Sequence, residues 1–124
     1  MRPPRLVAAS VTIGTSKPRE LAAFYARLLN APLTAEEPDG GWAQIRCESG
    51  LTLNFEFERH HVRPDWPTVS GGQNPTQHLD ILVDDLDSAV AWAAEGGAVP
   101  ADFQPQDDVR VMFDPDGHPF CLFR

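Results

Sequence analysis

Acidic residues that could transfer protons lie in the stretch LTLNFEFE, where Glu56 and Glu58 alternate with Phe55 and Phe57. Successive side chains of a β-strand point to opposite faces of its sheet. If the phenylalanines pack in a core, both glutamates lie on the other face, which water or a ligand must fill. We therefore predict an acid–base role for Glu56, and the alternative is a charge on a solvated sheet face.

The histidines offer further titratable groups. His60 and His61 lie in a stretch rich in proline and glycine, residues 58–76. We expect solvated loop residues there, with an acid–base role as the alternative. His118 follows the turn glycine Gly117 and is expected at the surface.

Two cysteines, Cys47 and Cys121, are too few for a disulfide framework, so we predict free thiols. The tight turn signal DPDGH precedes the strand of Cys121. It must fix the register of that strand, because a shift of one residue would turn Cys121 to the opposite face.

Each of the three tryptophans has its own setting. Trp42 follows a glycine pair at the start of a strand and is predicted to line the rim of a pocket. Trp66, in the sequence PDWP, either closes a pocket or fixes its loop to the body of the protein. Trp92 lies off the apolar stripe of its helix, where it flanks the core or contacts a second subunit.

Hydrophobic periodicity divides the chain into one series of elements that occurs twice. Apolar residues three and four positions apart predict helices at 16–30 and 85–97, and alternating or β-branched stretches predict strands. The predicted strands are 5–13, 42–47, 51–57, 77–85, 109–113 and 119–123, with shorter ones at PLTA and VPAD. We therefore predict two βαβββ modules, with a two-unit ferredoxin-like arrangement as the alternative.

These modules form a single α+β domain of residues 1–124. Module 1 takes residues 1–58, a linker residues 59–76, and module 2 residues 77–124. Pro18 suits the start of the first helix, and Asn30 suits a left-handed end to it. Asp84 or Asp85 is expected to cap the second helix.

Composition excludes several kinds of partner. The formal net charge is −8, and no cluster of Lys or Arg offsets it, so nucleic acids and anionic membranes are disfavoured. No apolar run approaches the ~20 residues that span a bilayer. Residues 1–10 lack the long apolar stretch of a signal peptide, so we expect a cytoplasmic protein.

Three stretches carry a resemblance to a known superfamily. AAFYARLLNAPL, QHLDILVDDLDSAV and FDPDGHPFCLF resemble a helix end, a second-module opening and a last hairpin of the vicinal oxygen chelate superfamily. Its members include glyoxalase I, bleomycin-resistance proteins and extradiol dioxygenases. The resemblance covers nearly the whole chain and is closest to small glyoxalase-like domains. It implies curled antiparallel sheets around a cup and a homodimer, whose modules pair within one chain or between chains.

The resemblance also implies positions for metal ligands in the cup. They fall at Ser10, at Asn54 or Glu56, at His78, and at Cys121, where metal-dependent relatives carry Glu. Only His78 is a typical ligand in its expected place. We therefore expect no cofactor, and the alternative is a divalent-metal site of Glu56, His78 and Cys121.

Two classes of function follow from this resemblance. The first is a metal-independent lyase or isomerase that transfers a proton next to a carbonyl group, without true glyoxalase I activity. The second is a non-catalytic protein that sequesters a cationic or neutral organic ligand, as bleomycin-resistance proteins do. The predicted catalytic residues are Glu56 and His78, and the predicted ligand-binding residues are Trp42, Asn54, Trp66 and Cys121.

Overall fold

The computed structural model describes all 124 residues and contains both predicted βαβββ modules. Module 1 consists of β1 (Val11–Thr15), α1 (Pro18–Leu29), β2 (Leu33–Glu36), β3 (Trp42–Arg46) and β4 (Thr52–Phe57). Its strands form one sheet in the order β1-β4-β3-β2. β1 runs parallel to β4, and the other pairs are antiparallel.

Module 2 repeats this topology. It consists of β5 (Leu79–Leu82), α2 (Leu86–Glu95), β6 (Val99–Pro100), β7 (Val109–Phe113) and β8 (Pro119–Phe123). Its sheet has the order β5-β8-β7-β6, again with the parallel pair at one edge. The duplicated α+β architecture predicted from the sequence is therefore confirmed.

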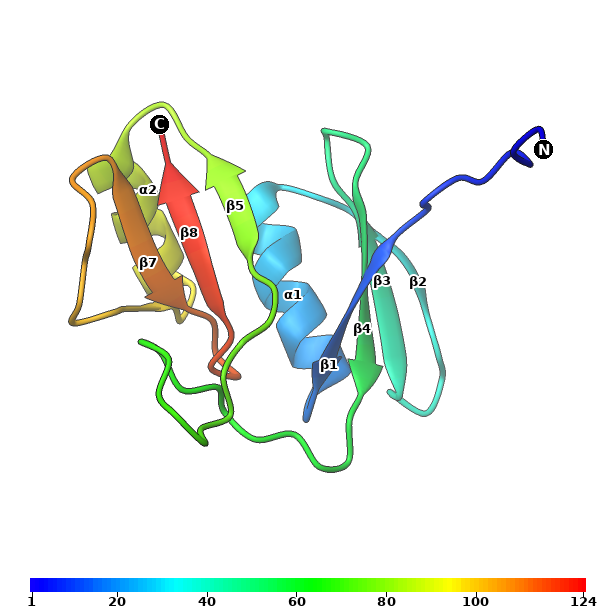
Figure 1. The fold of residues 1–124 in the computed structure, drawn as a ribbon, viewed down its shortest axis with the longest axis horizontal. Coiled ribbons are helices and arrows are strands. Elements are labelled where there is room, and N and C mark those ends of the chain that lie inside the picture. Colours follow the sequence, from blue (N-terminus) through cyan, green and yellow to red (C-terminus); the bar gives the residue numbers. More distant parts are fainter.

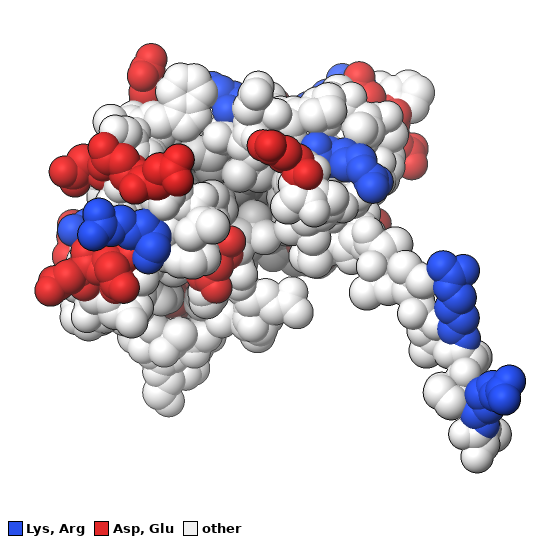
Figure 2. Space-filling model, turned by 90° about the horizontal axis from the view of Figure 1, so that it is seen from above, with Lys and Arg blue, Asp and Glu red and all other residues white.

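The first strand differs from its prediction. The sequence favoured residues 5–13, but β1 runs from Val11 to Thr15, because only these residues find partners in β4. Residues 1–10 extend from the body as an exposed arm (Figures 1 and 2). Leu6 and Val7 on this arm are 85% and 69% exposed. Hydrophobicity alone did not make a strand where no neighbour was present to accept its hydrogen bonds.

The helix ends follow local rules. Pro18 is the first residue of α1, where its missing N–H is not needed. Asn30 ends this helix in the left-handed conformation, with φ of 50°. Asp85, and not Asp84, caps α2, since its carboxylate accepts hydrogen bonds from backbone amides of the first turn.

One hydrophobic core joins the two modules. Its 14 buried residues come from both sheets and both helices. Figure 1 shows α1 between the two sheets. The ring of Tyr25 in α1 stacks on Phe55 of module 1 at 5.6 Å and meets Phe120 of module 2 edge-on at 5.9 Å. α1 therefore packs against both modules, which fixes one sheet relative to the other.

Trp92 joins the two helices. Its indole is 46% exposed, and the guanidinium of Arg27 lies 3.7 Å from the ring centroid. The indole N–H also donates to the Leu28 carbonyl of α1, at 3.3 Å. Trp92 was predicted either to flank the core or to contact a second subunit. Its contacts within the chain are those of a residue that flanks the core.

Neither helix has the length and hydrophobicity needed to cross a membrane. On the face shown in Figure 2, many carboxylates gather over the module 2 end, while the arm carries basic side chains. The distribution is consistent with the expectation that polyanions are poor partners for the body of the protein.

Candidate functional site

Three chemically active side chains meet on the outer face of the module 2 sheet. Asp80 in β5 is the parallel partner of Cys121 in β8, and His78 lies two residues before Asp80. Phe120 and Leu122, which flank Cys121, are buried in the core, so Cys121 points away from it. The ligand atoms of His78, Asp80 and Cys121 all lie within 4.8 Å of one another. We call these residues the β5–β8 cluster.

A chain of polar contacts connects this cluster. His78 Nε2 lies 3.1 Å from Asp80 Oδ1. Burial raises the pKa of the Cys121 thiol, and the charge of Asp80 and a hydrogen bond with it raise the pKa further. Cys121 is thus a protonated thiol at neutral pH and a weak nucleophile. Asp80 lies between the thiol and the imidazole, where its carboxylate can orient His78 for proton transfer.

The donor set of the cluster also suits a divalent metal. An imidazole nitrogen, a carboxylate oxygen and a sulfur are the ligands that Zn²⁺ takes in proteins, and a set of three leaves one position open. The thiol must lose its proton to bind, so metal affinity would fall with decreasing pH. Asp80 takes the place that the sequence prediction gave to Glu56 in this set.

Asn54 belongs to a polar network on the outer face of module 1. Its amide donates to the Ser10 hydroxyl at 3.0 Å, and its carbonyl accepts from Gln44 at 2.8 Å. Asn54 is only 8% exposed, so these bonds satisfy an amide that is largely withdrawn from water. Ser10 and Asn54, two of the positions that the resemblance implied for ligands, are therefore neighbours. In this structure they are hydrogen-bonded to each other.

Trp42 and Glu56 lie together in a second place on this face. They are direct partners across β3 and β4. A recess of about 380 Å³ is lined by these two residues with Glu37, Asp39 and Gly41. An indole beside three carboxylates is suited to an organic cation.

The predicted pair of Glu56 and His78 is not assembled within one chain. Glu56 lines the recess on module 1, whereas His78 belongs to the β5–β8 cluster on module 2. Trp66 lines neither place: its ring packs against Phe103 at 5.8 Å and Phe113 at 6.4 Å. Trp66 was predicted either to close a pocket or to fix its loop to the body of the protein. Its contacts with Phe103 and Phe113 fix the linker to module 2.

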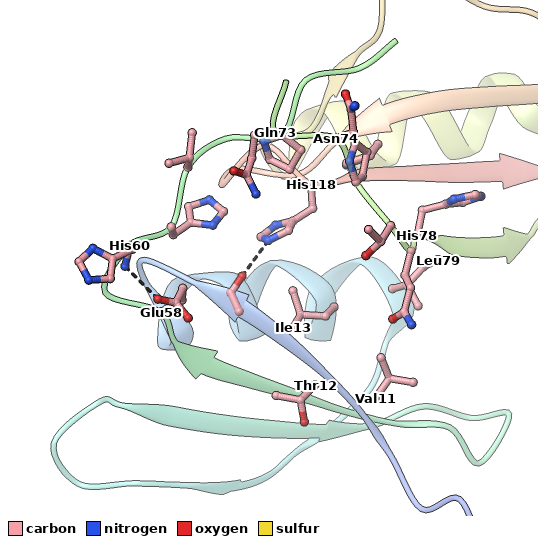
Figure 3. A pocket seen from close by; sticks show the side chains of 18 of the residues that line it. Val11, Thr12, Ile13, Glu58, His60, Gln73, Asn74, His78, Leu79 and His118 are labelled. Atoms are coloured by element: carbon pink, nitrogen blue, oxygen red, sulfur yellow. Dashed lines mark hydrogen bonds between the residues drawn. The ribbon is translucent and has the colours of Figure 1, made fainter. Parts of the chain in front are cut away.

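A cleft of about 900 Å³ lies between the modules (Figure 3). Its walls are residues 11–14 of β1, residues 73–79, part of the linker around His61, and His118. Tyr25 contributes to its lining from α1. Figure 3 shows the imidazole of His78 directed away from this cleft, so His78 lies at its rim and faces the β5–β8 cluster.

Two of the histidines are not where the sequence suggested. The side chain of His61 is only 10% exposed, and its Nε2 lies 3.2 Å from Asp116 Oδ2. The side chain of His118 is 20% exposed and contacts Asp114 and the Gly14 carbonyl. The expectations of a solvated His61 and a surface His118 were wrong, because the β7–β8 turn packs against the end of β1. His60 is exposed, as predicted.

Hydrogen bonds around this turn shift several pKa values. Burial raises the pKa of Asp116, but bonds from Thr15 and Ser16 outweigh it, and the net pKa is lowered. Burial lowers the pKa of His118, but its bond to Asp114 and the charge of that carboxylate outweigh it, and the net pKa is raised. Burial raises the pKa of Tyr25, and Asp114 raises it further.

The sequence contained a signal for Asp80 that was not used. Asp80 lies two residues after His78, so both side chains must share one face of the strand. The sequence did not show that β8 pairs with β5 so that Cys121 lies directly beside Asp80.

The model of the glyoxalase-like domain family matches residues 10–123. A mutant of the fosfomycin resistance protein FosX from Listeria monocytogenes, with Mn(II) and a dihydroxypropylphosphonic acid bound, is similar in structure. It is 14% identical, with a TM-score of 0.70 over 94% of this chain and 88% of its own. FosX from Mesorhizobium loti is 11% identical, with a TM-score of 0.68 over 94% of this chain and 89% of its own.

A glyoxalase/bleomycin resistance protein/dioxygenase family enzyme from Burkholderia phytofirmans PsJN is also similar. It is 15% identical, with a TM-score of 0.68 over 92% of this chain and 94% of its own. Among curated protein sequences no match was found. At these identities the solved structures establish a common fold, and the chemistry must be argued from the residues of this chain.

Proposed function

The chain belongs to the glyoxalase-like domain family and has the vicinal oxygen chelate fold, and we propose that it is a small-molecule enzyme of the lyase or isomerase type. In this proposal His78 moves a proton next to a carbonyl group of the substrate. Asp80 is a positioning residue that holds the imidazole in one orientation. Cys121 lines the site as a neutral thiol.

One observation carries the proposal: the 3.1 Å contact between His78 Nε2 and Asp80 Oδ1. A carboxylate that accepts from one imidazole nitrogen leaves the other nitrogen to exchange a proton with a substrate. Proton transfer by a positioned histidine contributes about 10²–10⁴-fold to a rate. His78 also lines the rim of the cleft between the modules, so a substrate held in the cleft must extend past this rim to meet the imidazole on the outer face of the sheet.

We propose that Glu56 joins this site from the second chain of a homodimer. Within one chain, Glu56 and His78 lie on the outer faces of different sheets, and both faces are uncovered. Leu82, which shares a face of β5 with Asp80, is 71% exposed although it is apolar, and on the outer face of module 1 the indole of Trp42 lies beside Glu56. Packing the module 1 face of one chain against the module 2 face of another would cover them and bring the predicted acid–base pair together.

Proton exchange tests this chemistry before a substrate is known. The protein is incubated in D₂O with a panel of α-hydroxy ketones, α-keto acids and diketones, and loss of α-protons is followed by NMR. We expect His78→Ala to lower the exchange rate by about 10²–10⁴-fold. Asp84→Asn, a change at an exposed residue beyond β5, is the control and should leave the rate unchanged. An exchange rate that survives His78→Ala would exclude His78 as the proton carrier.

Glu56→Gln examines the contribution of the second chain. If Glu56 is catalytic, this variant abolishes exchange, but a mixture of Glu56→Gln and His78→Ala chains regains part of it in mixed dimers. Recovery requires that one intact site be built from two different chains. Mixed dimers without any recovery would place both residues in the same chain's site.

A divalent metal is a second candidate, which the donor set of the cluster favours. His78, Asp80 and Cys121 would hold it, and it would supply polarisation of a substrate oxygen. Metal content by elemental mass spectrometry, after dialysis against Zn²⁺, Mn²⁺, Fe²⁺ or Ni²⁺, tests this in the wild type and in Asp80→Asn. Near-stoichiometric metal in the wild type and its loss in Asp80→Asn would support a metal site. Equal metal content in both proteins would exclude Asp80 as a ligand.

Ligand sequestration is the alternative function, and the acidic recess at Trp42 favours it. A cationic aromatic compound bound there would stack on the indole and face the carboxylates of Glu37, Asp39 and Glu56. Under this alternative Glu56→Gln changes only the affinity. Tryptophan fluorescence titrated with planar organic cations, in the wild type and in Trp42→Leu, separates the two functions.

A further inference from the structure

The turn between β7 and β8 connects the modules through side chains that the proposed function does not use. Asp116 accepts hydrogen bonds from the Thr15 hydroxyl at 2.6 Å and from the Ser16 amide and hydroxyl, both at 2.9 Å. Asp114 accepts one from the Tyr25 hydroxyl at 2.8 Å. The donors belong to module 1 and the acceptors to module 2, and both carboxylates are buried.

His118 adds a contact whose geometry defines its protonation. Its Nδ1 lies 2.9 Å from Asp114 Oδ2, and its Nε2 lies 2.8 Å from the Gly14 carbonyl oxygen (Figure 3). Carboxylate and carbonyl oxygens accept hydrogen bonds but do not donate them. Both contacts are hydrogen bonds only if each nitrogen carries a proton, as in the imidazolium form of His118. A neutral ring would keep one contact and direct a lone pair at the other oxygen.

The charged and titratable groups near His118 come from every element packed against it. The His61 ring of the linker lies 5.0 Å away, and Arg63 donates to the Pro115 carbonyl at 3.3 Å. Burial opposes the charge on His118, but the neighbouring carboxylates outweigh burial, and the pKa of His118 is raised. The remaining groups are Asp114 and Asp116 of the turn, Tyr25 of α1 and Glu58 beside Gly14.

We propose that residues 114–118 form a proton-dependent latch between the modules, in which doubly protonated His118 bonds module 2 to β1. Loss of one proton leaves a neutral ring that can donate to only one of its two acceptors. The contact with the buried Asp114 carboxylate is the stronger, so the bond to Gly14 is released. Gly14, His61 and His118 all line the cleft, and the release loosens that end of it.

Two NMR measurements on the intact protein test the latch. Long-range ¹H–¹⁵N spectra report the protonation of each histidine nitrogen, and we expect both nitrogens of His118 to stay protonated to a pH above the ordinary histidine pKa of about 6.5. Amide exchange, corrected for the intrinsic pH dependence, reports opening. We expect exchange at Ser16 and Asp116 to accelerate about tenfold as His118 loses its proton, the factor for one hydrogen bond to a charged group.

Variants distinguish the latch from a general effect of pH. His118→Gln can donate at one end only, so its exchange at Ser16 should be fast at every pH. His60→Gln changes an exposed neighbouring histidine and should behave like the wild type. A neutral nitrogen on His118 at pH 6, or a pH-dependent step in exchange that persists in His118→Gln, would overturn the proposal. The first result needs only the wild type, so it holds even if a variant does not fold.

Discussion

Replacing Asp116 with Asn should destabilise the protein strongly without changing its shape. The side chain of Asp116 is 8% exposed, and donors surround its carboxylate. Thr15 Oγ1 and the Ser16 amide donate to Oδ2, and the Ser16 hydroxyl donates to Oδ1. His61 Nε2 lies 3.2 Å from Oδ2 and 3.0 Å from the backbone carbonyl oxygen of Asp116. Asn is nearly isosteric, but it has no charge and carries an NH₂ group in place of one acceptor.

The magnitude follows from these contacts. Hydrogen bonds to a charged group contribute about 1.5–3 kcal/mol each, whereas neutral ones contribute about 1 kcal/mol. The Asn oxygen can keep the donors at Oδ2 with weaker bonds, and the Ser16 hydroxyl can rotate to accept from the new NH₂. We therefore expect Asp116→Asn to lower the free energy of unfolding by about 2–3 kcal/mol, and the melting temperature by about 10 °C.

The effect should depend on pH with a definite sign. The pKa of Asp116 is lower in the folded chain than in the unfolded one, so its contribution is present above the unfolded pKa of about 3.9. This contribution is lost as the pH falls through the pKa of the folded state, because Asp116 is then protonated in the folded chain as well as in the unfolded one. The difference between the wild type and Asp116→Asn should thus be constant from about pH 5 to 7 and shrink below about pH 4.

Urea unfolding followed by tryptophan fluorescence, at pH values from about 3 to 7, measures this difference. Asp108→Asn, at an exposed residue of the β6–β7 loop, is the matched control, and its effect should stay below about 0.5 kcal/mol. A difference for Asp116→Asn under about 0.5 kcal/mol at pH 7 would refute the reasoning. So would a difference of constant size down to pH 3.

The other predictions concern the same turn and its counterpart in module 1. Tyr25→Phe keeps the stacked rings but loses the 2.8 Å bond to buried Asp114, and should cost about 1.5–2 kcal/mol in urea unfolding; a cost near zero would mean that the bond is not formed. Gly117→Ala should cost about 2–3 kcal/mol, because φ is +91° and the new Cβ would lie 3.1 Å from Arg63 Cβ, which cannot move aside as the guanidinium can. Gly50→Ala, with φ of +95° and open space, should cost only about 1 kcal/mol, and equal costs would contradict the role of Arg63.

Much of the fold was predictable because its determinants are local. The helix of α1 follows from apolar spacing, Pro18 at its start and Asn30 at its end, all within about a dozen residues. The hairpins follow from turn signals between short strands. The first strand was misplaced because its extent depends on pairing with β4, whose Leu53 lies 42 residues after its partner Val11.

The candidate site was predictable only in part. His78 and Cys121 were identified by resemblance, and the structure places them in one cluster. Asp80 was missed because its role depends on a parallel pairing between strands at opposite ends of module 2. The pairing of Glu56 with His78 stays a prediction that requires a second chain.

By itself the sequence determined the duplicated modules, the helix ends, the turns and the acidic surface, since each depends on residue type and on short-range spacing. Tertiary structure alone decided which polar groups are buried together. Thr15 and Asp116 are 101 residues apart and meet at 2.6 Å. The ring of His118 lies between two acceptors only because the turn brings a carbonyl of β1 to one side of it and a carboxylate to the other. Such contacts depend on the packing of two modules around α1, which no local pattern records.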